Sequence, residues 1–204
     1  MPKIGMQPIR RQALIEAAIQ TIHERGSLEV TVGQIAKRAG VSSALAHHYF
    51  GSKDSLILST MRYLLTELTT DLRATLAAAR TPRDRITQVI RANFTPSQFD
   101  PAVVSAWLVF YVRAQSSPEA RRLLRVYAGR LHSNLAHALA QITDSVHAHA
   151  IAEGAGALID GLYIRRALKS GSPDPESAIQ VVETFVDAML AQSEPIREIS
   201  NGRG

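Results

Sequence analysis

Side chains suited to contacting nucleic acid are concentrated in one short segment of the chain. The segment begins with small residues and ends with hydrogen-bond donors, in the order Ser42, Ser43, Ala44, Leu45, Ala46, His47, His48 and Tyr49. Small side chains in a first helical turn allow a helix N-terminus to approach base edges or phosphates closely. The segment therefore has the composition of a helix that approaches DNA.

Lys53 follows this segment at a position where its positive charge is unfavourable with the dipole of the expected helix. Ser52 and Asp54 predict that a long helix starts here, with Ser52 as its cap and Asp54 near the positive end of the helix dipole. A cation in the same first turn is unfavourable, and a phosphate held by Lys53 and the helix amides would remove the conflict. An exposed lysine that is indifferent to its position is the alternative.

A second group of residues combines aromatic rings with a carboxylate. Trp107 and Tyr111 are four residues apart and share a helix face, and Asp160 and Tyr163 are three apart in an otherwise apolar segment. Unless Asp160 lies at the surface, its carboxylate needs either an arginine partner or a cationic guest. Ring faces attract a quaternary ammonium ion by about 0.5–2 kcal/mol each. The group fits either an aromatic cage for such a cation or an aromatic core with a paired aspartate.

No set of residues predicts catalysis, a metal site or a cofactor. The chain contains no cysteine, which excludes disulfides, iron–sulfur clusters and cysteine nucleophiles. The glycine-containing segment 154–156 lacks the third glycine and the preceding strand of a dinucleotide loop. Two histidine pairs could bind a metal ion. His47 and His48, however, lie in the segment expected to approach DNA, and we expect His147 and His149 at a solvated helix start. The sequence therefore predicts a binding protein rather than an enzyme.

Helical spacing dominates the chain and predicts an all-α fold. Apolar residues recur at intervals of three and four, and a capping residue precedes a proline at 81–82, 100–101, 117–118 and 174–175. Proline suits the first helical position because it lacks the N–H that would stay unpaired there. We expect about nine helices, near residues 9–25, 32–39, 43–49, 53–79, 82–94, 102–115, 118–141, 146–169 and 175–191.

Two of these helices predict a helix-turn-helix. Thr31 and Gln34 match a capping box at the start of the first helix, and Gly40 can take the left-handed conformation that ends it. Ser42 caps the second helix. Helices this short persist only by packing on each other and on the helix at 9–25. The arrangement is typical of DNA-binding proteins.

The charge distribution agrees with a polyanionic partner at this end of the chain. Of the 204 residues, 1–53 contain seven Lys/Arg and three acids, which gives +4, and the remainder contains 16 and 15, which gives +1. A solvated basic surface is the alternative. The sequence has neither an apolar export signal nor a segment long enough to span a bilayer, so we expect a cytoplasmic protein with no membrane partner.

The segment from Thr31 to Leu56, TVGQIAKRAGVSSALAHHYFGSKDSL, resembles the DNA-binding domain of TetR-type transcriptional regulators. Ala44 replaces a glycine that is common in the family, and His47 replaces a tyrosine, which affects the expected operator sequence rather than DNA binding. The resemblance implies nine helices, a homodimer formed by the last two, and ligand-controlled release of double-stranded operator DNA. The residues expected to contact DNA are Thr31, Ser42, Ser43, Ala44, Leu45, His47, His48, Tyr49 and Lys53.

The segments NFTPSQF, SAWLVFYV and ALIDGLYIRRAL resemble the choline-responsive repressors of this family. This similarity implies a repressor of choline-to-glycine-betaine genes in osmotic stress, with choline as the effector and no cofactor. A repressor that responds to another hydrophobic or cationic effector, and a DNA-packaging protein indifferent to sequence, are the alternatives. We expect choline to contact the rings of Trp107, Tyr111 and Tyr163, with Asp160 as counter-charge and Phe94 and Asn93 as further candidates.

The expected domains are a helix-turn-helix DNA-binding domain at 1–52, a ligand-binding and dimerisation domain at 53–192, and a disordered tail at 193–204. Small residues of the helix at 146–169 and an apolar stripe on the last helix could form a four-helix bundle between two subunits. The alternative is that both stripes pack within one subunit. The residues concerned are Ala152, Ala155, Gly156, Ala157, Ile179, Val182, Phe185, Val186 and Met189.

Overall fold

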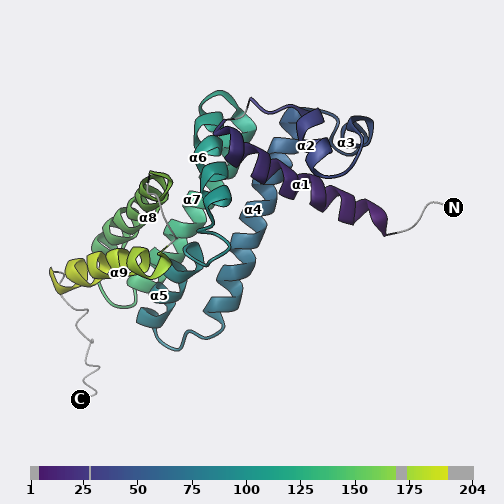
Figure 1. The fold of residues 1–204 in the computed structure, drawn as a ribbon. Coiled ribbons are helices and arrows are strands. Elements are labelled where there is room, and N and C mark those ends of the chain that lie inside the picture. The colour runs from purple at the N-terminus through teal and green to yellow at the C-terminus, as the bar shows by residue number, and fades with distance from the viewer. Residues whose placement is uncertain (1–4, 28, 169–173, 193–204) are drawn as a thin grey trace, which may run out of the picture. The chain divides into compact units, whose positions relative to one another are not determined.

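The computed structural model describes residues 5–27, 29–168 and 174–192. Within these ranges the regular elements are nine α-helices, as the sequence predicts, and the ends of the helices differ by a few residues from the predicted ones (Figure 1). The tail predicted at 193–204 lies outside the described residues. The helices are α1 (Met6–Arg25), α2 (Val32–Arg38), α3 (Ser43–Phe50), α4 (Lys53–Leu76), α5 (Pro82–Asn93), α6 (Pro101–Ser116), α7 (Pro118–Leu139), α8 (Ser145–Ala167) and α9 (Pro175–Gln192).

The helix starts follow the predicted caps. All four cap–proline pairs begin helices, because each capping side chain satisfies a backbone N–H in the first turn that has no partner within the helix. The hydrogen bonds are accepted by Thr81 from Asp84 (3.0 Å), Asp100 from Ala102 (2.8 Å), Ser117 from Ala120 (3.3 Å) and Asp174 from Ser177 (3.0 Å).

Contacts divide the chain into two compact units. Among the described residues, the first unit comprises 5–27, 29–70, 96–127 and 163–168, and the second comprises 71–95, 128–162 and 174–192. The helix-turn-helix segment and α6 therefore belong to the same unit. The functional boundary expected between residues 52 and 53 stays a prediction.

The first unit is built around α1. This helix packs against α2 and α6, and α2 packs against α3. Leu14, Ala18 and Ile22 of α1 are fully buried, and so are Ile35 of α2 and Leu56 of α4. The short helices of the helix-turn-helix are thus stabilised by a shared apolar core rather than by their own hydrogen bonds.

α6 is apolar on nearly every side, which predicts a buried helix, but the structure buries it only in part. Trp107 and Phe110 are 4% and 0% exposed, whereas Val112 is 66% exposed. Val112 is five positions after Trp107, which places their side chains about 140° apart around the helix. The helix therefore buries one broad face and leaves Val112 at the surface of the chain.

In the second unit, α5 packs against α9. Two ion pairs join them, between Arg83 and Asp187 at 2.9 Å and between Arg91 and Glu176 at 2.9 Å. The apolar stripe of α9 is largely buried within the chain itself, since Ile179, Val182 and Val186 are each at most 4% exposed. For these three residues, packing within one subunit is the alternative that holds.

Other residues of α8 and α9 remain at the surface. Val181 is 44% exposed and Phe185 is half-buried. The Phe185 ring lies against Gly154 of α8, where a Cβ atom would come within 2.5 Å of its Cζ atom. None of the helices in the described ranges combines the length and apolar character that a membrane span requires.

Candidate functional site

The first helix of the helix-turn-helix is fixed at both ends by the predicted residues. Thr31 Oγ1 accepts a hydrogen bond from the N–H of Gln34 at 3.2 Å, and Gln34 Oε1 accepts one from the N–H of Thr31 at 2.9 Å. Val30 and Ile35 are buried beside this capping box, as a hydrophobic staple requires. Gly40 has a φ of 68°, which confirms the left-handed end of α2.

α3 carries most of the predicted DNA contacts and buries only one face. Ser42 caps it by accepting a hydrogen bond from the N–H of Leu45 at 3.2 Å. Ala46 and Phe50 are buried against the rest of the unit. None of the predicted contact residues is buried: Thr31, Ser42, Ser43, Ala44, His47 and His48 are exposed, and Leu45, Tyr49 and Lys53 are half-buried.

The His47 ring has one nitrogen engaged by the protein. Its Nδ1 lies 3.1 Å from the carbonyl oxygen of Gly51. A carbonyl only accepts, so Nδ1 carries the proton in this contact. Nε2 of the neutral ring is then an acceptor at the exposed surface of α3. Such an acceptor suits the amino groups of adenine or cytosine in a major groove.

Lys53 begins α4, as predicted. Ser52 caps this helix by accepting a hydrogen bond from the N–H of Ser55 at 3.1 Å. The carboxylate of Asp54 pairs with Arg113 of α6 at 2.9 Å. The sequence gives no local signal for this pair because the partners belong to separate helices. The interaction of Lys53 with a phosphate stays a prediction.

The basic excess of the N-terminal segment is partly used inside the protein. Arg38 forms an ion pair with Glu24, and Arg11 donates a hydrogen bond to the backbone of α3. Arg10, Arg25 and Lys37 are exposed. These contacts leave the net charge of +4 unchanged, because that count already includes Glu24, but they engage Arg11 and Arg38 within the protein.

Three of the six predicted effector residues lie in the first unit. Trp107 contacts the rings of Phe110 and Tyr127, with centroid distances of 6.2 and 5.4 Å. Tyr163 meets Phe99 edge to face at 5.6 Å. Tyr111, one helical turn after Trp107, is half-buried. Sequence reasoning missed both Tyr127 and Phe99, because a single aromatic residue in an amphipathic segment carries no signal of its partners.

The other three predicted effector residues belong to the second unit. Asn93 and Phe94 are 3% and 1% exposed, and Nδ2 of Asn93 donates a hydrogen bond to the carbonyl of Val89 at 2.8 Å. Asp160 on α8 is half-buried, so it is neither a fully solvated nor a fully buried carboxylate. The grouping of all six residues into one cation site stays a prediction.

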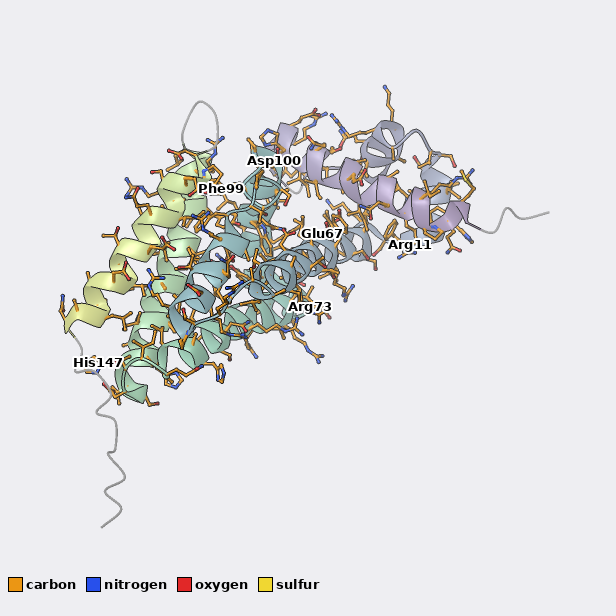
Figure 2. The ribbon with its side chains drawn as sticks, turned by 90° about the horizontal axis from the view of Figure 1, so that it is seen from below. Arg11, Glu67, Arg73, Phe99, Asp100 and His147 are labelled. Atoms are coloured by element: carbon orange, nitrogen blue, oxygen red, sulfur yellow. The ribbon has the colours of Figure 1, made fainter. Side chains whose placement is uncertain are left out.

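The first unit also contains a cavity of about 320 Å³ that the sequence did not predict. α1, α4 and the segment 96–103 line it, and Glu16, Glu67 and Asp100 bring three carboxylates to its wall. Figure 2 shows Glu67 on α4 and Asp100 at the start of α6. The pKa of Tyr63, also in the wall, is raised mainly by burial and further by the charges of Glu67 and Glu16. The three carboxylates give the cavity wall a negative potential, which favours a cationic guest over an anionic one.

α6 has a polar contact with α1 as well as its apolar packing. Nδ1 of His23 lies 2.8 Å from Oγ of Ser105, which donates its own proton to the carbonyl of Pro101 at 2.9 Å. A hydroxyl has one proton, so His23 is the donor to Ser105. Ser105 precedes Trp107 by two residues, and the predicted effector helix is thereby attached to α1.

The histidines of α8 lie at a helix start, as expected. His147 and His149 are exposed in the first turns. His147 contacts Asp144, which caps the helix, and His149 stacks on His132 with 5.2 Å between the rings. In the described part of the chain, no three His, Asp or Glu residues are grouped as metal ligands would be.

Known proteins match both parts of the chain. The family model for bacterial regulatory proteins of the tetR family matches residues 14–60, and the model for the C-terminal domain of BetI-type transcriptional repressors matches 82–191. HTH-type transcriptional regulator BetI of Brucella anthropi is 60% identical over 190 residues, which cover 93% of this chain and 98% of that protein. The BetI regulator of Rhizobium meliloti is 51% identical over 190 residues, 93% and 94% of the two chains.

Solved structures share the fold. A transcriptional regulator from Pseudomonas aeruginosa PAO1 has a TM-score of 0.77 at 24% identity and covers 93% of both chains. A transcriptional regulator from Saccharomonospora viridis, solved in complex with choline, has a TM-score of 0.76 at 24% identity, with 87% of this chain and 95% of that chain covered. At these identities the likeness extends to the fold alone.

Proposed function

This chain belongs to the TetR family of bacterial regulatory proteins and has a BetI-type repressor domain, and on that premise we propose that it represses choline-to-glycine-betaine genes until choline binds. Regulators of this family are DNA-binding proteins rather than enzymes. Highly similar relatives are named BetI, and a protein of the same fold was solved with choline. A cytoplasmic repressor of an osmotic-stress response accounts for these relationships.

α3 is the recognition helix of this repressor. The observation that supports this role is its exposed first turn, in which Ser43 and Ala44 follow the Ser42 cap. Small side chains there let the helix enter a major groove, where His47 and His48 reach base edges. Lys53 and the first amides of α4 bind a neighbouring phosphate.

Two copies of the chain bind one operator. TetR-family regulators bind operator DNA and dimerise, and a two-fold dimer presents its recognition helices to successive major grooves, about 34 Å apart. α8 and α9 form the dimer contact through residues that the single chain leaves at its surface, such as Val181. Buried residues of α9, including Val182, support that surface from within.

The effector site recognises choline by its charge and lack of N–H groups. A quaternary ammonium ion cannot donate a strong hydrogen bond, so ring faces hold it, here those of Trp107, Tyr111 and Tyr163. Asp160 supplies the counter-charge. Phe94 and Asn93 complete the site, and the amide oxygen of Asn93 suits the hydroxyl of choline.

Choline acts by shifting a population between two arrangements of the DNA-binding segment. Its effect is limited to the difference between its affinities for the two states. Two contacts within the first unit support coupling through α6, which carries Trp107. Ser105 of α6 bonds to His23 of α1 at 2.8 Å, and Arg113 pairs with Asp54 of α4 at 2.9 Å.

Calorimetry with choline and its neutral carbon analogue tests the effector. In the analogue a tert-butyl group replaces the trimethylammonium group, so the shape is kept and the charge is lost. We expect choline to bind and the analogue to bind at least about tenfold more weakly, since cation–π contacts from three rings together exceed 1.4 kcal/mol. Equal binding of the two compounds would favour a repressor for an apolar effector instead.

Competition with random DNA at fixed salt tests the DNA-binding function. Phosphate contacts alone cannot discriminate between sequences. A duplex that the protein selects from a randomised pool should therefore resist competition by random DNA. Equal competition would favour a DNA-packaging protein that is indifferent to sequence.

A further inference from the structure

Arg11 of α1 contacts the C-terminal end of the recognition helix. Its Nη1 donates a hydrogen bond to the carbonyl oxygen of Tyr49 at 2.6 Å, and its guanidinium carbon lies 4.5 Å from the centre of the Phe50 ring. Arg11 is half-buried and Phe50 is 8% exposed. Figure 2 labels Arg11 on α1. One cationic side chain thus contacts both a backbone carbonyl and the buried ring at this end of α3.

The end of α3 needs such a partner. The last carbonyl groups of a helix have no N–H four residues ahead, and they form the negative end of the helix dipole. Here the chain leaves the helix at Gly51, whose φ is 73° and whose N–H bonds to the carbonyl of His47 at 2.7 Å. The carbonyl of Tyr49 takes no part in this bond. Arg11 donates a hydrogen bond to it from a charged group, and a charged donor forms a stronger hydrogen bond than a neutral one.

We propose that Arg11 is a positioning residue for operator recognition: it holds α3 in place from α1 and does not bind DNA itself. The proposal rests on the function proposed for α3. With eight residues, α3 is too short to persist alone, and Ser42 fixes only its N-terminal end. Arg11 fixes the other end, directly beside His48 and Tyr49, whose side chains are among the predicted contacts.

This role separates Arg11 from its neighbour in the basic N-terminal segment. Arg10 is exposed, and a cation at an exposed position next to DNA acts mainly through phosphate charge. A phosphate contact contributes equally to specific and random DNA and increases the dependence of affinity on salt. A positioning contact instead affects specific DNA, because only base contacts depend on the exact placement of α3.

The test compares Arg11→Ala and Arg11→Lys with Arg10→Ala, which removes the same charge one residue away. The probes are the duplex that the wild-type protein selects from a randomised pool and a random duplex of equal length, each measured over a range of salt. Amide hydrogen exchange of residues 46–51 in the DNA-free protein gives a readout that is independent of DNA.

For Arg11→Ala we expect about tenfold weaker binding of the selected duplex, as for loss of a charge-assisted hydrogen bond. Binding of random DNA should change less than about twofold with an unaltered salt slope, and exchange at the end of α3 should become faster. Arg11→Lys keeps the charge and a donor but not the planar stacking, so it should recover part of the affinity. Arg10→Ala should leave exchange unchanged. If Arg11→Ala does not fold, the ratio of the affinities for the selected and the random duplex is measured for Arg11→Lys instead.

Equal weakening of both duplexes by Arg11→Ala, with a salt slope reduced by about one, would make Arg11 a phosphate contact and overturn the proposal. Unchanged exchange in α3 would overturn it as well. A wild-type protein that selects no duplex would instead contradict the function proposed for α3. The exchange measurement would then still decide whether Arg11 holds this helix.

Discussion

The guanidinium of Arg113, near the end of α6, lies 2.9 Å from the carboxylate of Asp54, in the first turn of α4. This pair joins the helix that carries Trp107 to the helix that directly follows α3. The two side chains are 31% and 62% exposed, so solvent screens the pair and it adds at most about 1 kcal/mol to stability. From its position, we expect the pair to matter more for coupling between choline and DNA binding than for folding.

Arg113→Gln should reduce the response to choline more than it affects operator binding. Without the ion pair, α6 can shift without moving the start of α4. The coupling free energy between choline binding and DNA binding should then be smaller. We expect operator affinity without choline to stay within about threefold of wild type, since exposed pairs contribute little. Fluorescence anisotropy of a labelled operator, with and without saturating choline, measures both quantities.

The charge reversal Arg113→Asp with Asp54→Arg provides the control. It rebuilds an ion pair at the same place, and the response should return at least in part. A single Arg113→Gln variant that responds to choline like the wild type would exclude this pair from the coupling.

Asp160→Asn should weaken choline binding and leave operator binding intact. The substitution keeps the size of the side chain and removes the counter-charge of the proposed cage. Because the lost charge interaction is partly buried, we expect choline affinity to fall about tenfold, as measured by calorimetry.

Glu67→Gln is the matched control, because it makes the same chemical change in the acidic cavity of the first unit. We expect normal choline binding from this variant. Should Glu67→Gln lose choline binding while Asp160→Asn keeps it, the cation binds in that cavity and the proposed cage is wrong.

Lys53→Ala should weaken DNA binding and leave choline binding unchanged. Loss of one phosphate contact reduces affinity for operator and random DNA by a similar factor and lowers the salt slope by about 0.9. Binding titrations at several salt concentrations give this slope directly. A variant with the wild-type slope would show that Lys53 does not contact a phosphate in the complex.

Gly154→Ala should destabilise the packing of α8 on α9. Its new Cβ would lie 2.5 Å from Cζ and 3.0 Å from Cε1 of Phe185. Overpacking costs about 1–3 kcal/mol, which equals or exceeds the gain of about 1 kcal/mol from replacing a helical glycine. Denaturant unfolding should therefore give a lower free energy of unfolding than in the wild type.

Gly161→Ala on the same helix is the control, since nothing lies within 4 Å of its added Cβ. This variant should be as stable as the wild type or more stable. If both variants gain stability equally, the Phe185 ring moves aside at little cost and the close approach has no structural weight.

Helix ends and turns could be predicted from the sequence because their causes are local. A cap such as Thr31 or Ser42 acts on an N–H three residues away, and Gly40 ends a helix through its own backbone. Contacts between distant residues left no such signal. His23 and Ser105 are 82 positions apart, and Arg11 and Tyr49 are 38 apart.

Apolar patterns were informative about burial but not about the burying partner. The stripe of α9 predicted a buried face, and Val182 and Val186 are indeed buried, although within the chain itself. A periodic stripe does not say whether the surface that covers it belongs to the same subunit or to a second one. For the same reason, the aromatic residues of α6 could be identified as a group without their neighbour Tyr127.

The most direct test measures the affinity of the protein for its selected operator during titration with choline, at fixed salt, in parallel with the neutral carbon analogue. We expect choline to lower operator affinity at least about tenfold, a coupling of about 1.4 kcal/mol, and the analogue to have no such effect. Operator affinity that is unchanged at saturating choline would show that choline is not the effector of this repressor.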